Sequence, residues 1–313
     1  MIWNRLFFYF CRAFNELICK LVKLYRKYIP SKIRHAVNTA FLGATLIFFR
    51  NFRENLKAKR IYLFQRILPD TEKNRMYAFM GKHGLTQCPY PFVLEYKNRQ
   101  ISYFFDEQSN MFYINHAGKK LYFPKTYKEK EIVSMYKTLI MEQDIRSPHQ
   151  YVKNINRLKG KILLDIGAAE ALFSLDAIEL VNYVYIFECD ENWIEALTAT
   201  FEPWKNKIMI VRKYVTDIND ENNITIDRFL EGKEKTNLFL KMDIEGYEQV
   251  ALKGASDILK EAHDIDFSIC TYHKENDVVE IANILQTYGL EYEQTDGYLH
   301  RGKDFRKAII RRK

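Results

Sequence analysis

The chain has 313 residues, of which 47% are hydrophobic and 28% charged, the proportions of a folded, soluble protein of one or two domains. Its five cysteines form no CxxC pair, which argues against a zinc site and a disulfide framework. The formal net charge of +8 conceals an asymmetry, because the first 100 residues hold 19 Lys and Arg against 5 Asp and Glu. Such a basic N-terminal part favours an anionic partner, namely a lipid surface, a nucleic acid or an acidic polysaccharide precursor, or it is simply a solvated surface.

Residues 1–75 are predicted to form a basic, aromatic helical segment. From Ile2 to about Tyr28, apolar residues recur at spacings of three and four with Lys and Arg between them. This pattern is typical of an amphipathic helix that either lies on an anionic membrane or packs against its own protein. Two further helices are expected, from Ile33 to Phe49 and from Arg53 to Ile67, after which Pro69 breaks the pattern.

Apolar segments in this part of the chain are short. The first apolar run covers about six residues, fewer than a signal-peptide core. The longest uncharged stretch, Ala36 to Phe49, covers about 14 residues, fewer than the roughly 18 that a membrane span requires. We therefore expect a cytoplasmic protein, with the N-terminal basic helix as the candidate for peripheral contact at the inner membrane face.

Residues 76–130 are predicted to form a small antiparallel β region that is a candidate for acceptor binding. Short aromatic and β-branched runs at 90–96, 100–106 and 111–124 are separated by turn residues, and a hairpin is expected at Ala117 and Gly118. Helical spacing returns from Glu129 to Gln143.

Residues 131–313 alternate between strand and helix patterns. Strands are expected in residues 161–167, 184–190, 207–215, 236–243, 265–273 and 307–312, with helices in 170–180, 191–201, 246–262 and 276–289. This alternation predicts an α/β fold with a Rossmann-like, doubly wound parallel sheet. Ligands bind at the carboxyl ends of the strands in such sheets, so the candidate site residues are those that follow each strand.

The first strand of this region ends in Asp165 and a turn of small residues, Gly167, Ala169 and Ala171. Small side chains let the backbone approach a ligand, but alanine at two of these positions would crowd a pyrophosphate. The turn therefore favours S-adenosylmethionine over a dinucleotide, although small residues after a strand are common. Glu188, about 21 residues beyond Gly167, ends the second strand, where its carboxylate can accept hydrogen bonds from both ribose hydroxyls.

Asp217 follows the third strand, where it either accepts a hydrogen bond from the adenine amine or forms an Asx-turn. Asp243, Glu245 and Glu248 then place three acids within six residues. They either hold a cationic ligand or a divalent metal beside the acceptor, or cap the next helix. His273 ends the fifth strand and is either a general base for the acceptor hydroxyl or a structural histidine.

Four segments in this order resemble the FkbM-type class I methyltransferases over about residues 140 to 300: LLDIGAAEALFSL, IFECDENW, TIDRFL and LKMDIEGYEQVALKGA. The resemblance implies cofactor contacts at Asp165, Gly167, Glu188 and Asp217. It implies catalytic or acceptor-positioning roles for Asp243 and Glu245, with Glu248 behind them. Ala169, Glu170 and Asp243, in the turn and at a strand end, are further candidates for cofactor binding. The family commonly has glycine where this chain has Ala171, whose methyl group should narrow the turn.

The segment EQDIRSPHQY also resembles one that precedes the fold in related enzymes, which implies that Glu142, His149 and Tyr151 lie at the cofactor mouth. The expected reaction is O-methylation of a hydroxyl on a saccharide or other small molecule, free or lipid-linked, in polysaccharide or glycoconjugate biosynthesis. The alternatives are an RNA methyltransferase and a non-catalytic scaffold that binds a partner or a membrane. Against RNA, no NPPY-like tetrad follows the fourth strand, and the acids there would repel a phosphate backbone, so no nucleic-acid partner is expected.

Overall fold

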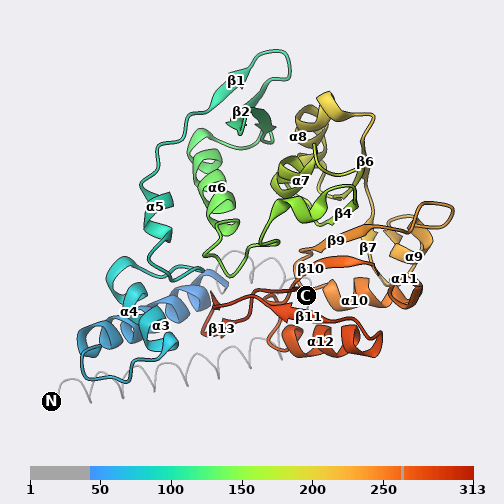
Figure 1. Cartoon of the computed structure of the whole chain (residues 1–313). Coiled ribbons are helices and arrows are strands. Elements are labelled where there is room, and N and C mark those ends of the chain that lie inside the picture. The colour runs from blue at the N-terminus through green and yellow to red at the C-terminus, as the bar shows by residue number, and fades with distance from the viewer. Residues whose placement is uncertain (1–42, 262–263) are drawn as a thin grey trace, which may run out of the picture.

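The computed structural model describes residues 43–261 and 264–313. The helix expected over residues 2–28 lies outside these residues, as does the first part of the helix expected from Ile33. Figure 1 shows a sheet with helices on both faces and a helical N-terminal part beside one edge of the sheet.

The central sheet has seven strands in the order β11-β14-β10-β9-β4-β5-β6. The five strands from β10 to β6 are parallel neighbours. Their bounds are β4 Ile162–Ile166, β5 Tyr183–Phe187, β6 Ile208–Val211, β9 Leu238–Met242 and β10 Asp266–Cys270. Because the chain steps outward from β4 to β6 and then returns to β9 and β10, the strand order reverses between β4 and β9, where doubly wound sheets bind ligands. The predicted Rossmann-like sheet is confirmed.

One strand departs from the predicted parallel arrangement. β14 (Ile309–Arg312) is antiparallel to β10 and to β11 (Tyr292–Gln294). A hairpin of β12 (Leu299–Arg301) and β13 (Asp304–Arg306) connects β11 to β14 without a crossover helix. A parallel neighbour requires such a crossover, so the chain returns in the opposite direction.

Two apolar cores cover the two faces of the sheet, because alternate side chains of a strand point to opposite faces. Leu163 of β4 packs in the core that contains α7 (Leu172–Ala177) and α8 (Glu191–Phe201). Leu164 packs in the other core, with α9, α10, α11 and α12. Their bounds are α9 Ile226–Phe229, α10 Glu248–Lys253, α11 Ser256–Glu261 and α12 Asp277–Thr287.

The single helix predicted over residues 246–262 is wrong, because the chain breaks between α10 and α11 at Gly254. A Cβ built on Gly254 would lie 2.1 Å from the carbonyl oxygen of Thr216. Thr216 follows β7 (Tyr214–Val215), which pairs with β8 (Asn223–Ile224). Only glycine permits this close approach between the helix end and the loop after β7.

Two predictions in the N-terminal part are also wrong. The break expected at residues 50–52 is absent from the described residues, since α3 runs without interruption over Gly43–Phe64. It packs on α4 (Glu72–His83), a helix that the sequence pattern did not predict. The strand expected at residues 90–96 is instead α5 (Val93–Lys97), which begins from successive turn hydrogen bonds at Tyr90, Pro91 and Phe92; proline favours such a helix start.

The predicted antiparallel region is formed by β1 (Phe104–Asp106), β2 (Met111–His116) and β3 (Lys119–Tyr122). Its expected hairpin is confirmed, with positive φ at both Ala117 and Gly118, as a tight two-residue turn requires. The predicted helix that follows is α6 (Glu129–Glu142). Two short 3-10 helices complete the elements of the described residues, Ile155–Leu158 and Glu202–Trp204.

The antiparallel region packs on the central fold rather than standing apart from it. Leu121 and Phe123 share one core with Phe173 of α7 and Phe201 of α8, and the Tyr122 amide donates to Thr200 Oγ1 at 3.0 Å. The domain boundaries at residues 75 and 130 stay predictions. None of the helices in residues 43–261 and 264–313 has the length and hydropathy of a membrane span.

Candidate active site

A cavity of about 950 Å³ lies at the carboxyl ends of β4, β5 and β9, where the strand order reverses. Its walls are the turn after β4, the ends of β5 and β9, the loop around β7, and the end of α6 with the segment after it. This volume suits a ligand the size of a nucleoside or larger. The cavity contains most of the residues that the sequence predicted for the cofactor, namely Asp165, Gly167, Ala169, Glu170, Glu188 and Asp243.

The turn after β4 has left-handed backbone at Gly167, Ala169 and Ala171, with φ of 76°, 46° and 54°. A Cβ on Gly167 would lie 2.1 Å from the carbonyl oxygen of Asp243, so this position requires glycine. Both alanines line the cavity, where side chains in place of glycine would crowd a pyrophosphate. Ala171 adopts left-handed backbone despite its methyl group, and the expected narrowing of the turn stays a prediction.

A buried ion pair anchors this turn. Lys241 Nζ lies 2.9 Å from Asp165 Oδ1 and donates to the Gly167 carbonyl oxygen at 2.6 Å. The other oxygen of Asp165 accepts from Ser174 Oγ at 2.6 Å. Burial acts to lower the pKa of Lys241, but the nearby Asp165 and Asp243 carboxylates outweigh it and raise that pKa. Asp165 therefore holds the turn through Lys241, a residue that sequence reasoning missed because it lies in the middle of a strand pattern.

Glu188 accepts hydrogen bonds from three backbone amides. Its Oε2 accepts from Ala169 N at 2.8 Å, and its Oε1 accepts from Cys189 N at 2.7 Å and Asp190 N at 2.8 Å. These contacts lock the end of β5 to the turn after β4. A carboxylate offers about four acceptor positions, so Glu188 retains capacity for a ligand hydroxyl.

Two further acids line the cavity. Burial raises the pKa of Glu170 to about 8, with backbone hydrogen bonding and Lys241 opposing the shift and the Glu142 carboxylate reinforcing it. Burial likewise raises the pKa of Glu142, although His149 opposes the shift. Acids whose ionisation is suppressed by burial gain most from a cationic ligand, which restores the charged form.

Asp217 lies apart from these residues. Its side chain is exposed, and it is not among the residues that line the cavity in the described part of the chain. The wall there is formed by Lys213, Val215 and Thr216. The predicted contact of Asp217 with adenine stays a prediction without support from this geometry.

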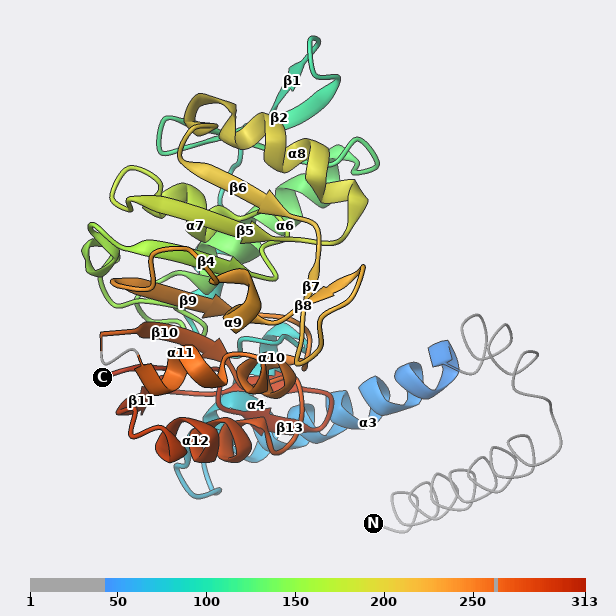
Figure 2. The ribbon, with the colours of Figure 1, turned by 90° about the vertical axis from the view of Figure 1, so that its right-hand side faces the viewer.

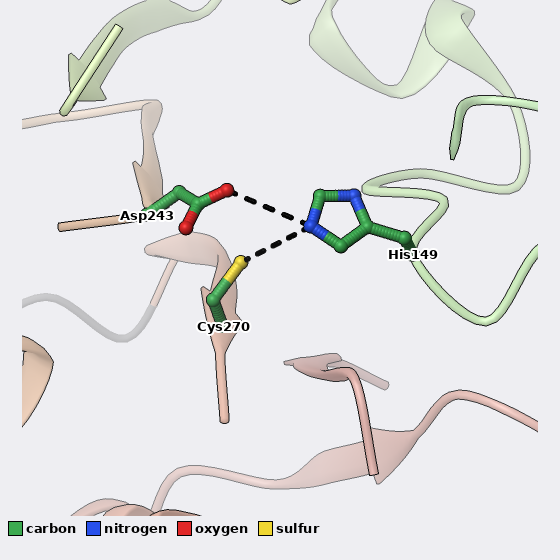
Figure 3. Close-up of side chains that lie close together, drawn as sticks. All are labelled: His149, Asp243 and Cys270. Carbon is green, nitrogen blue, oxygen red and sulfur yellow. Dashed lines mark hydrogen bonds and ion pairs between the residues drawn. The ribbon is translucent and has the colours of Figure 1, made fainter. Parts of the chain in front are cut away.

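Asp243 is the centre of a hydrogen-bond network. Tyr151 Oη donates to its Oδ2 at 2.9 Å, and Tyr272 Oη lies 3.3 Å from its Oδ1. Figure 3 shows His149 Nε2 directed toward both Asp243 and Cys270, at 3.6 Å from Oδ2 and 3.8 Å from Sγ. Burial acts to raise the pKa of Asp243, but His149 and Lys241 outweigh it and hold that pKa below its ordinary range.

The other predicted catalytic residues meet at the same carboxylate. His273 Nε2 lies 3.4 Å from Asp243 Oδ1 and 3.5 Å from Glu245 Oε2, and its Nδ1 lies 3.0 Å from Glu248 Oε1. Glu248 is fully buried and also accepts from the Ile244 amide at 2.9 Å. Glu245 stands at the rim, with its side chain 84% exposed. His273 is nearly buried and does not line the cavity in the described residues, so it lies behind Asp243.

Burial acts to lower the pKa of His273, but the surrounding carboxylates, Glu248 first and then Asp243 and Glu245, outweigh it and raise that pKa. The same balance raises the pKa of His149, with Glu142 and Asp243 as its partners. Both histidines thus favour the protonated form beside Asp243.

Two groups in the described residues bring candidate metal-ligand atoms within 4.8 Å of one another: His149, Asp243 and Cys270, and Asp243, Glu248 and His273. In the first group, the His149 Nε2 atom also lies 3.2 Å from Tyr272 Oη. The tyrosine hydroxyl therefore satisfies the nitrogen that a metal would need. A divalent metal at either group stays a prediction.

Part of the chain matches a known protein family. Residues 181–292 match the family model described as the methyltransferase FkbM domain. The resemblance to the FkbM-type class I methyltransferases is thereby confirmed. No curated protein matches the chain.

Solved structures of methyltransferases resemble the chain loosely. The methyltransferase FkbM from Methylobacillus flagellatus KT is 20% identical, over 56% of this chain and 54% of that one, with a TM-score of 0.40. The METTL16 MTase domain is 12% identical, over 74% of this chain and 94% of that one, with a TM-score of 0.42. Trm5b from Pyrococcus abyssi is 13% identical, over 64% of this chain and 55% of that one, with a TM-score of 0.39. The chain thus spans about half the length of the FkbM structure that it matches.

Proposed function

We propose that this methyltransferase, whose residues 181–292 match the FkbM domain, uses S-adenosylmethionine to methylate a hydroxyl group of a sugar in polysaccharide or glycoconjugate biosynthesis. The observation that carries the proposal is the convergence of the Gly167 turn, the Glu188 carboxylate and the Asp243 carboxylate on one cavity. The acceptor class rests on the family resemblance and on the chemistry of the cavity rim.

The cavity residues suit a phosphate-free, cationic nucleoside. Ala169 and Ala171 line the cavity where glycines would be needed to admit a pyrophosphate, while Glu188 keeps acceptor capacity for ribose hydroxyls. Glu142 and Glu170 offer carboxyl groups that a positive charge would help to ionise. When bound, S-adenosylmethionine supplies a methyl group that is already activated by its positively charged sulfur, so alignment supplies much of the acceleration.

Asp243 orients the acceptor in this proposal. Its carboxylate lines the cavity, held by Tyr151 and Tyr272, and accepts a hydrogen bond from the acceptor hydroxyl. His273 lies behind Asp243, with its Nε2 atom 3.4 Å from Asp243 Oδ1. It accepts the proton of the acceptor hydroxyl by way of the Asp243 carboxylate and does not contact the acceptor itself. Only neutral His273 can accept a proton, so turnover should rise with pH as His273 is deprotonated.

The rim of the cavity offers groups that suit a sugar. Tyr247 lines the cavity with its side chain 60% exposed, and Glu245 is more exposed still. An aromatic face can pack on a sugar ring, and a carboxylate accepts hydrogen bonds from hydroxyls. The exposed aromatic residues of the β1 region, Tyr103, Phe104 and Phe105, are a second candidate surface for stacking.

Calorimetry with S-adenosylmethionine and S-adenosylhomocysteine is the first test, followed by transfer of labelled methyl groups to a panel of sugar nucleotides and lipid-linked sugars. We expect both ligands to bind. Asp243→Asn should lower turnover by on the order of 10² or more, while Glu191→Gln, an exposed control, should not. No binding heat with either ligand would overturn the proposal.

An RNA acceptor is the second candidate, favoured by the basic residues of α3, which include Arg53, Lys59 and Arg60. The acids at the cavity, Glu188, Asp243 and Glu245, would repel a phosphate backbone. Tight RNA binding that weakens with salt would favour this candidate. Absence of cofactor binding would instead favour a non-catalytic scaffold.

A further inference from the structure

Helix α3 exposes an apolar row on the face that points away from the protein. Phe52, Leu56 and Leu63 are 40%, 40% and 73% exposed, and their spacing of four and seven places them on one side of the helix. Phe48 extends the row and stacks on Phe52, with 6.5 Å between ring centroids. Isolated exposed apolar side chains are common, but several on one helical face mark an interaction surface.

The opposite side of α3 is the one that packs. Ala58 is fully buried against α4, where a Cβ on Gly81 would lie 2.3 Å from the Ala58 carbonyl oxygen. Glu54 is also buried, and its Oε2 accepts from Tyr77 Oη at 3.2 Å. The exposed row is therefore not the packing face of α3 against α4.

Basic side chains lie beside the exposed row, and Lys59 lies within it, between Leu56 and Leu63. Arg50, Arg53, Lys59 and Arg60 are all exposed, and Arg53, Lys59 and Arg60 make no ion pair with any residue that the structure describes. Glu54, the one acid of α3, is buried on the packing side. An apolar row bordered by unpaired cations is the pattern of a helix that lies in the interface of an anionic bilayer.

One end of α3 projects on the cavity side of the molecule. Figure 2 shows that α3 runs past the sheet, so that its N-terminal end projects on the side to which the parallel strands point. The cavity lies at those strand ends. The exposed row therefore begins, near Phe48, at the end of α3 that projects on the side of the molecule where the cavity lies.

Side-chain contacts connect α3 to the residues around Asp243. His300 of β12 lies 3.7 Å from Glu54 Oε2. In the same hairpin, Arg301 lies 4.0 Å from Glu245 Oε2, and Arg306 donates to the His273 carbonyl oxygen at 2.6 Å. The hairpin between β12 and β13 therefore holds the helix in a fixed relation to the cavity.

We infer that α3 is a membrane-docking helix that places the exposed row formed by Phe48, Phe52, Leu56 and Leu63 in the surface of an anionic phospholipid bilayer. Docking there brings the cavity mouth close to the bilayer, where a lipid-linked sugar would be presented. The delivery of such an acceptor rests on the proposed function; the membrane contact itself does not.

The test is sedimentation of the full chain with vesicles of phosphatidylcholine, with and without about one third phosphatidylglycerol. We expect binding only to the anionic vesicles, and we expect salt to weaken it. Phe52→Ser with Leu63→Ser should reduce the partition coefficient by on the order of tenfold. The matched control Val279→Ser removes an apolar side chain that is 55% exposed on α12 and should leave binding unchanged. Equal binding by the double variant and the parent chain would overturn the inference.

Hydroxyl-radical footprinting of Phe48 and Phe52 distinguishes the bilayer from other occupants. We expect both rings to react in the free chain and to be protected by anionic vesicles. Protection before vesicles are added would mean that another part of the chain or a second copy covers the row, which overturns the inference. Cofactor calorimetry on the same variants separates the two claims, because a failure to bind S-adenosylmethionine refutes the proposed function and leaves vesicle binding standing.

Discussion

Replacing Lys241 with methionine should destabilise the fold strongly, because it leaves a buried carboxylate without its counter-ion. The side chains of Lys241 and Asp165 are 5% and 1% exposed, and their charged atoms are 2.9 Å apart. Removing one partner of such a pair lowers the free energy of unfolding by about 3 to 5 kcal/mol. Ser174 still donates to Asp165 in the variant, so the lower end of this range is expected. Methionine fills a similar volume, which keeps a cavity from contributing.

Urea unfolding of the parent chain and the variant measures this loss. Asp165→Asn in the Lys241→Met background removes the unpaired charge, so it should recover part of the stability. The control is Lys235→Met, whose ion pair with Glu261 is 3.7 Å long and largely exposed; it should lose less than about 1 kcal/mol. A loss below about 1 kcal/mol for Lys241→Met, or no recovery in the double variant, would refute the assignment of Lys241 as the anchor of the cofactor turn.

Four further predictions concern the cavity. Gly167→Ala places a Cβ at a positive φ and 2.1 Å from the Asp243 carbonyl oxygen, so thermal unfolding should show that the free energy of unfolding falls by about 2 to 4 kcal/mol. In the control Gly232→Ala, φ is also positive but the space is open, so the free energy of unfolding should fall by only about 1 kcal/mol. Glu188→Ala removes the acceptor of three amides and should weaken S-adenosylmethionine binding by about tenfold or more in calorimetry, a result that unchanged affinity would contradict. Because the pKa of Glu170 is raised from 4.5 to about 8, its folded form holds an extra proton between these values; stability should fall as pH rises across that window, and Glu170→Gln should flatten the fall in denaturation measured at several pH values. Three acidic neighbours raise the pKa of His273, so turnover should continue to rise with pH above the pH at which an ordinary histidine is deprotonated. If the turnover of the His273→Gln variant rises with pH in the same way, another group accepts the proton.

The sequence pattern alone was sufficient to predict those helices and turns that depend on local periodicity and turn residues. The helix over residues 191–201 has the predicted bounds, and the hairpin at Ala117 and Gly118 follows from turn chemistry. The candidate site was predictable for a related reason. Parallel strands end at one edge of a sheet, so residues that follow successive strands, such as Glu188 and Asp243, must lie near each other.

Where the pattern was ambiguous, either local turns or contacts distant in sequence decided the outcome. Residues 90–96 have the composition of a strand, yet a helix forms after Pro91. Gly254 ends a helix because the loop at Thr216 passes too close for any side chain. Such approaches depend on how elements pack, which the local sequence does not encode.

The sequence by itself determined which residues end the strands, because hydrophobic alternation and turn residues act over a few neighbouring positions. Only the tertiary structure decided what surrounds them: Lys241 against Asp165, His273 behind Asp243, Asp217 outside the cavity, and an apolar row on the exposed face of α3. The physical reason is that charge pairing and burial are set by distances between groups far apart in the chain, and those distances exist only once the sheet and its helices have packed.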